Sequence, residues 1–65
     1  MNITINQQIL TFDKEIKLTE VLEIYKASQP YAILLNGEFL PQSEHGCTWL
    51  KDSDKIDVVG AIQGG

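Results

Sequence analysis

The segment Ala61-Ile62-Gln63-Gly64-Gly65 at the end of the sequence offers the clearest chemistry, through the carboxylate of Gly65. A carboxylate is ionised at neutral pH and is a poor electrophile. Another enzyme can activate it by joining it to the α-phosphate of ATP, if the carboxylate reaches a site that excludes water. Five extended residues span about 17 Å, which is enough to enter such a site.

The residue types of this segment suit that use. Gly64 and Gly65 have no Cβ, so they can pass through a channel too narrow for a side chain. Ordering the segment costs about 1–2 kcal/mol per residue, which the apolar Ile62 and hydrogen bonds of Gln63 are expected to offset. The alternative is a frayed terminus without function, since a Gly-Gly pair also arises by chance.

Other reactive side chains form weaker combinations. Nothing visible holds His45 and Cys47 in the geometry of a base and a nucleophile, so we expect a partly buried or surface pair. One His and one Cys without a second cluster do not make a metal site. Asp52, Asp54 and Asp57 lack the loop length, central glycine and distal glutamate of a calcium loop. The sequence therefore predicts no catalytic residue and no metal.

The composition limits the class of protein. The 65 residues suffice for one domain, and a single cysteine excludes an internal disulfide, which fits the cytoplasm. The first residues show neither a signal peptide nor a membrane span. The net charge of −4 argues against a nucleic-acid partner and favours a basic protein surface.

The N-terminal residues predict a β-hairpin. Residues 2–6 alternate between apolar and polar, with Ile3 and Ile5 on one side. Polar residues 6–8 can turn the chain, and residues 9–13 alternate again, with Leu10 and Phe12 on one side.

A helix of about three turns is predicted next. One apolar stripe has the spacing of a helix face: Leu18, Val21, Leu22 and Tyr25. Thr19 is the expected N-cap, and Glu20 and Lys26 suit the two ends of the helix dipole. Since Pro30 disfavours helical angles in the residue before it, the helix should end by Ser28.

The second half of the chain predicts three more strands. Residues 31–35 are continuously apolar, as in a strand covered on both faces. Asn36-Gly37 predicts a type I′ turn into a short strand that Pro41 ends. Residues 42–50 are expected to be irregular, with Trp49 and Leu50 anchored on the core.

Residues 51–54 predict a polar turn before the last strand, residues 55–59, in which Ile56 and Val58 face the same way. Gly60 then predicts a bulge or bend where the chain leaves the sheet, and it can also serve as a hinge.

This order of elements predicts an α+β fold. One helix packed across a mixed sheet of about five strands buries every apolar stripe, with the first and last strands parallel in its middle. That arrangement is the β-grasp fold of ubiquitin, and an OB-like barrel is the alternative. We expect a β-grasp domain over residues 1–60 and a flexible C-terminal tail over residues 61–65. Because the Gly-Gly end directly follows such a domain, we expect it to be a functional tail and not a frayed terminus.

The sequence resembles the ThiS family, the sulfur carrier proteins of thiamine biosynthesis. The resemblance covers nearly the whole chain and lies in "ILLNGEFLP", in "LKDSDKIDVVGAIQGG" and in the length. These segments are similar to the family's Asn-Gly turn followed by Pro, its Leu-x-Asp-x-Asp-x-Ile segment and its Gly-Gly terminus. Two segments depart from the family pattern: Gln42-Ser43-Glu44, where a basic residue is common, and the loop with His45 and Cys47.

The resemblance implies a sulfur carrier that is a co-substrate and not an enzyme, with no bound cofactor. A ThiF-type enzyme would adenylate the carboxylate of Gly65 with ATP and magnesium. Sulfur that originates from cysteine, through a cysteine desulfurase, would then replace AMP and leave a thiocarboxylate. A ThiG-type thiazole synthase would take up this sulfur. Cys47 has no role in this cycle.

Three alternatives remain open from the sequence. A MoaD-like carrier for molybdopterin synthesis shares the fold and the Gly-Gly end, although such carriers tend to be longer. A ubiquitin-like modifier would be conjugated to lysines through Gly65. A plain binding module would make no use of its tail.

Overall fold

The computed structural model describes residues 1–27 and 29–60. Its elements follow the order β-β-α-β-β, then a 3₁₀ helix and a last strand. Their bounds are β1 (Asn2–Ile5), β2 (Gln8–Thr11), α1 (Leu18–Tyr25), β3 (Ala32–Leu35), β4 (Glu38–Leu40), η1 (Gln42–Cys47) and β5 (Lys55–Val59). Neither helix in the described part of the chain has the length and apolar character needed to cross a membrane.

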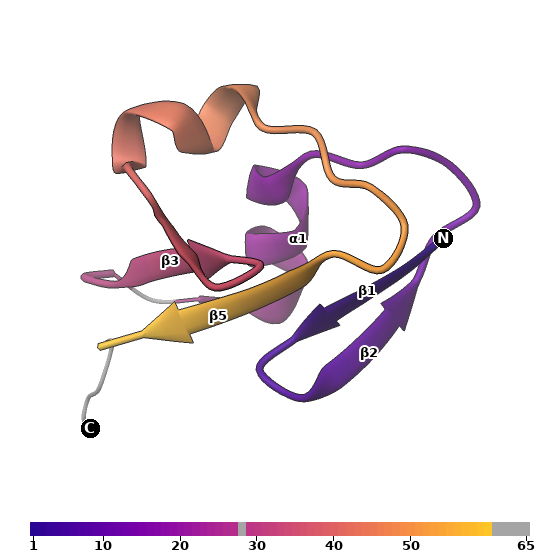
Figure 1. The fold of residues 1–65 in the computed structure, drawn as a ribbon, viewed down its shortest axis with the longest axis horizontal. Coiled ribbons are helices and arrows are strands. Elements are labelled where there is room, and N and C mark those ends of the chain that lie inside the picture. Colours follow the sequence, from indigo (N-terminus) through magenta and orange to yellow (C-terminus); the bar gives the residue numbers. More distant parts are fainter. Residues whose placement is uncertain (28, 61–65) are drawn as a thin grey trace.

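The five strands form one mixed sheet in the order β2-β1-β5-β3-β4. The first and last strands are neighbours and run parallel, with Thr4 opposite Lys55 and Ile5 opposite Ile56, whereas the other neighbouring pairs are antiparallel. In Figure 1, β1 and β5 lie side by side and point the same way. The predicted α+β, β-grasp arrangement with a parallel central pair is therefore confirmed.

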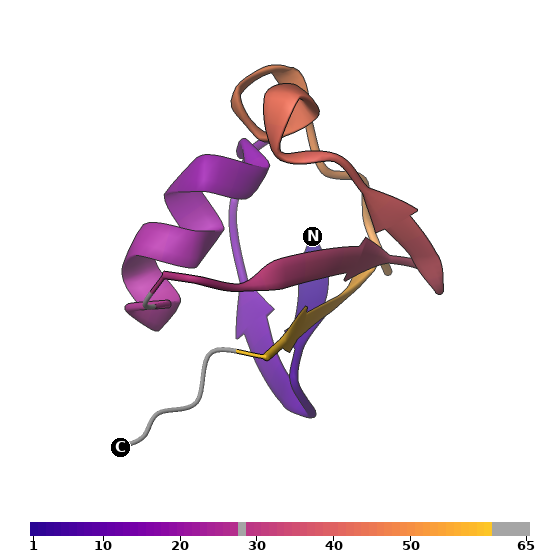
Figure 2. The same cartoon turned by 90° about the vertical axis from the view of Figure 1, so that its left-hand side faces the viewer.

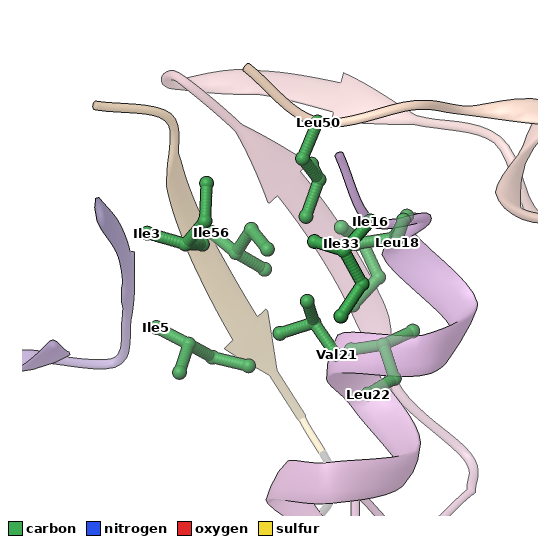
Figure 3. Close-up of a cluster of buried hydrophobic side chains, with 9 residues drawn as sticks. All are labelled: Ile3, Ile5, Ile16, Leu18, Val21, Leu22, Ile33, Leu50 and Ile56. Carbon is green, nitrogen blue, oxygen red and sulfur yellow. The ribbon is translucent and has the colours of Figure 1, made fainter. Parts of the chain in front are cut away.

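The core lies between the sheet and α1, which covers one face of the sheet (Figure 2). The strands contribute isoleucines at alternate positions, and the helix contributes the predicted stripe (Figure 3). The buried residues are Ile3, Ile5, Ile16, Leu18, Val21, Leu22, Ile33, Leu50 and Ile56. Tyr25, the last residue of the predicted stripe, packs against the rim of this cluster.

The predicted N-cap of α1 was wrong by two residues. Lys17 is the N-cap and Thr19 lies within the first turn, because the amide of Leu18 donates to the carbonyl of Thr48 at 3.0 Å. The Glu20 carboxylate accepts a hydrogen bond from the Lys17 amide at 3.0 Å. The distant contact with Thr48 and the local contact between Glu20 and Lys17 together place the helix start.

The predicted limit of the helix is confirmed, since it ends at Tyr25, before Ser28, but it is shorter than the predicted three turns. It has eight residues, and Lys26 follows it in the left-handed conformation at φ 64°. The Lys26 amide donates to Glu23, and the Ala27 amide donates to Leu22, which satisfies carbonyls of the last turn. A left-handed cap therefore ends the helix three residues before the effect of Pro30 begins.

The prediction that the third strand is covered on both faces was wrong. Ile33 is fully buried, whereas its neighbours Ala32 and Leu34 are only partly buried. Since α1 lies on one face, the side chains of Ala32 and Leu34 belong to the opposite, outer face of the sheet. The continuous apolar run thus reflects an apolar outer surface.

Residues 42–50 are partly regular. Residues 42–47 form η1, where the sequence predicted an irregular segment. Leu50 is buried as predicted, but Trp49 is 54% exposed and does not anchor the loop. The Leu50 amide donates to the Ile16 carbonyl, which turns Leu50 inward and Trp49 outward in an extended segment. The Nζ of Lys17 lies 5.2 Å from the centroid of the Trp49 ring.

The predicted turns are confirmed. Asn36 and Gly37 both have positive φ, 53° and 86°, as a type I′ turn requires. The polar turn before β5 is held by Asp54, whose Oδ2 accepts from the Lys51 amide at 2.8 Å. Asp52 accepts from the Asn2 amide at 2.7 Å, which joins this turn to the start of β1.

Candidate functional site

The predicted tail, Ala61 to Gly65, lies outside the described residues, so the site is described up to the point where the chain leaves β5. Val59 is the last residue of β5 and is registered opposite Ala32 of β3. Gly60 follows with φ 90°, a conformation that L side chains rarely adopt, and a bend lies there as predicted. Strand β3 therefore supports one side of β5 up to its last residue.

The other side of β5 is supported by the side chain of Asn6. Its Oδ1 accepts a hydrogen bond from the Val58 amide at 2.9 Å. Its Nδ2 donates to the Val58 carbonyl at 3.3 Å and to the Tyr25 hydroxyl at 3.0 Å. The sequence predicted Asn6 only as a turn residue, because its partner lies 52 positions away and no local pattern links the two.

An apolar surface surrounds this exit on the outer face of the sheet. We call it the outer-face patch and define it as Ala32, Leu34, Phe39 and Val59. Leu34 is registered opposite Phe39, and Ala32 opposite Val59, so the four side chains share one face. Phe39 is 64% exposed and Val59 is 47% exposed. Two exposed apolar side chains joined by the partly buried Ala32 and Leu34 form a continuous apolar surface, as is typical of protein-binding surfaces.

The described acidic residues do not gather into a metal site. Asp54 and Asp52 hold backbone amides in the turn before β5, as solvated turn residues do. Asp57 is registered opposite Leu34, which places its carboxylate on the outer face beside the patch. Within residues 1–27 and 29–60, no three His, Cys, Asp or Glu side chains are grouped to bind a metal ion.

His45 and Cys47 do different things in the structure. His45 is buried, its Nε2 donates to the Leu40 carbonyl at 3.1 Å, and its ring stacks on Tyr31 with centroids 6.3 Å apart. Cys47 is exposed, and its thiol donates to the Glu44 carbonyl at 3.6 Å. No hydrogen bond joins the two side chains. His45 thus has a structural role, and neither residue is placed as a nucleophile with its base.

The resemblance to sulfur carriers implies that the chain is loaded with sulfur, and we expect Cys47→Ser to leave the rate of that loading within about twofold of the rate for the unsubstituted protein. A serine hydroxyl can make the same contact with Glu44, and no described group activates the thiol. The rate of sulfur incorporation in a reconstituted assay measures this. A folded Cys47→Ser variant that accepts no sulfur would show that the thiol takes part in the transfer.

Comparison with known proteins identifies relatives over the full length. The model of the ThiS family matches residues 2–65. A crystal structure of a thiamine biosynthesis protein (ThiS) from Geobacter metallireducens is 32% identical, with a TM-score of 0.79 and coverage of 100% of both chains. An NMR structure of a thiamine biosynthesis protein from the same organism has a TM-score of 0.77 and 32% identity, covering 100% of this chain and 88% of that one. No curated protein sequence matches. The chain, with its β-grasp sheet and full-length match, belongs to the ThiS family.

Proposed function

We propose that this protein is a cytoplasmic sulfur carrier of thiamine biosynthesis and that Gly65 carries the sulfur. The observation that supports this most is the family match, which continues through residue 65 and so includes the Gly-Gly segment. The Geobacter ThiS chain is also covered in full. The same match favours the thiamine branch over a MoaD-like carrier.

The proposed cycle begins at the carboxylate of Gly65. A ThiF-type enzyme binds ATP and magnesium, and a carboxylate oxygen attacks the α-phosphate, which releases pyrophosphate and leaves an acyl adenylate. Sulfur that originates from cysteine is then delivered by a cysteine desulfurase as a persulfide, whose terminal sulfur displaces AMP to give an acyl disulfide. A thiol reduces this acyl disulfide, is itself oxidised to a disulfide, and so releases the thiocarboxylate. A ThiG-type thiazole synthase accepts this sulfur. The carrier is a co-substrate in each step and binds no cofactor of its own.

The proposed tail, Ala61 to Gly65, enters the active site of the partner. Gly64 and Gly65 occupy its narrowest part, since they have no side chain. Ile62 contributes apolar contact and Gln63 contributes hydrogen bonds, which offset the entropy lost when the segment is ordered.

The outer-face patch is the surface on which we propose that the adenylating enzyme docks. The patch includes Val59, which is six residues before Gly65 in the sequence. An adenylating enzyme that binds Gly65 in its active site therefore comes close to the outer face of the sheet. The Asp57 carboxylate beside the patch and the net charge of −4 favour a partner surface that is apolar with basic residues at its rim.

We expect Phe39→Ala to raise the carrier concentration for half-maximal adenylation by about tenfold, because an exposed aromatic residue within an interface commonly contributes that much. Ile9→Ala is the matched control, since Ile9 is 67% exposed but lies on β2, at the opposite edge of the sheet from Phe39 on β4. Initial rates of adenylation at varied carrier concentration measure both. Equal effects of the two substitutions would place the docking surface elsewhere.

The intact mass of the protein purified from its own host tests the proposed function. A sulfur carrier should show a fraction in which one oxygen is exchanged for sulfur. A protein modifier should instead show conjugates of higher mass in a denaturing blot, and a plain binding module should show neither. Conjugates without the exchange would contradict the proposal.

A further inference from the structure

The pairing between β1 and β5 stops before β5 does. The amide of Thr4 donates to the Asp54 carbonyl, and the amide of Asn6 donates to the Ile56 carbonyl, both at 3.0 Å. The chain then turns away, with positive φ of 46° at Asn6 and 72° at Gln7. From this point the backbone of β1 can no longer pair with Val58, although β5 continues to Val59.

The side chain of Asn6 replaces the missing strand. A primary amide offers the same donor and acceptor as a peptide group, and Asn6 uses both on the Val58 backbone, at 2.9 Å and 3.3 Å. The second hydrogen of its Nδ2 is directed to the Tyr25 hydroxyl at 3.0 Å. The last turn of α1 thus holds the amide in position, and these contacts are partly buried.

A second asparagine side chain makes one hydrogen bond to the backbone at the other end of β5. Asn36, also in a turn with positive φ, accepts from the Lys55 amide through Oδ1 at 2.9 Å and donates to Asp54 at 2.9 Å. The two residues are alike in their positive φ and in accepting a hydrogen bond from a β5 amide, whereas the Nδ2 of Asn36 donates to the Asp54 carboxylate and not to the strand. They differ in place: Asn36 holds the start of the strand, and Asn6 holds the end from which the chain continues to Gly65.

We propose that Asn6, held by Tyr25, is a positioning residue for the loading of Gly65. This role rests on the proposed function. Without the Asn6 amide, the N–H and C=O of Val58 lose these partners, only the pairing with β3 holds the end of β5, and that end can separate from the sheet. If the end of β5 is detached, the partner must order its residues on binding, and each ordered residue weakens binding about tenfold. A strand end that is already ordered in the free protein therefore favours entry of the tail.

Adenylation by the ThiF-type enzyme, followed as ATP–pyrophosphate exchange at varied carrier concentration, tests this role. We expect Asn6→Ala to raise the KM for the carrier about tenfold with kcat within about twofold, because ordering is lost and the reacting group is unchanged. Asn36→Ala is the matched control and should leave KM within about twofold. Amide hydrogen exchange should become faster at Val58 in Asn6→Ala and stay unchanged there in Asn36→Ala.

Tyr25→Phe is the second variant, since it removes only the hydroxyl that holds the Asn6 amide, and it should raise KM about threefold. It carries the test alone if Asn6→Ala does not fold, and an unchanged KM would then overturn the role. Equal KM values for Asn6→Ala and Asn36→Ala would overturn it as well. If the unsubstituted chain supported no ATP–pyrophosphate exchange, the proposed function itself would be contradicted. The positioning role of Asn6, which rests on that function, would then be contradicted as well.

Discussion

Deletion of Gly65 is expected to lower the rate of adenylation more than about 10²-fold and to leave the free energy of unfolding unchanged. The shortened chain still ends in a carboxylate, but that carboxylate lies about 3.4 Å short of its position in the unchanged chain. Reacting atoms must approach to about 3–3.5 Å, so a shift of one residue removes the attacking oxygen from the α-phosphate. The sheet pairings and the buried cluster lie within residues 2–59, which keeps the fold independent of Gly65.

Two substitutions separate the length of the tail from its width. Gly65→Ala keeps the length and adds one methyl group, and it should retain more activity than the deletion. Gly64→Val should block entry into the channel of the partner without a change in stability. ATP–pyrophosphate exchange and urea unfolding measure activity and stability in all three variants. An unchanged rate for the deletion variant would contradict the assignment of Gly65.

Ile56→Ala is expected to lower the free energy of unfolding by roughly 2–5 kcal/mol. Ile56 is fully buried in the central strand, between β1 and β3, and contacts the core that α1 covers (Figure 3). A domain of this size has a total stability of only about 3–5 kcal/mol, so much of the variant should be unfolded without denaturant.

Urea unfolding followed by far-ultraviolet circular dichroism measures this loss. Ile56→Val is the graded control and should cost about 0.5–1.5 kcal/mol. Ile9→Ala, at an exposed position of β2, should change stability by less than about 0.5 kcal/mol. If Ile56→Ala unfolded at the same urea concentration as the unchanged protein, the buried cluster would not be the main source of stability.

The sequence predicts most of the fold because its apolar spacing is regular. Ile3 and Ile5 alternate, the helix stripe keeps its spacing, and Asn36-Gly37 fixes a hairpin turn. Together these leave few arrangements that bury every stripe, and the parallel pairing of β1 with β5 follows.

Other features depend on contacts between distant segments and could not be predicted. Trp49 is apolar, yet the pairing of Leu50 with Ile16 directs it outward. Thr19 is a good N-cap by type, yet the contact between Leu18 and Thr48 starts the helix earlier. In both cases a backbone hydrogen bond from elsewhere in the chain outweighs a local preference of modest energy.

The candidate site divides in the same way. The residues of the tail follow from its composition, and they stay a prediction because they lie outside the described residues. The support of the exit does not follow from composition, since Asn6 is bonded to a residue 52 positions away. The outer-face patch could not be predicted from the apolar run Ala32–Leu35, because the sequence does not show whether an apolar residue faces the core or a partner.

The mass of the C-terminal peptide after reconstitution shows whether Gly65 carries the sulfur. The full chain is incubated with a ThiF-type enzyme, ATP, magnesium, cysteine and a cysteine desulfurase, and is then cleaved after Lys55 to release residues 56–65. We expect one oxygen to be exchanged for sulfur in this peptide, fragmentation to locate the sulfur on Gly65, and omission of ATP to prevent the exchange. Sulfur on the fragment that contains Cys47, with an unchanged C-terminal peptide, would contradict the assignment of the sulfur to Gly65.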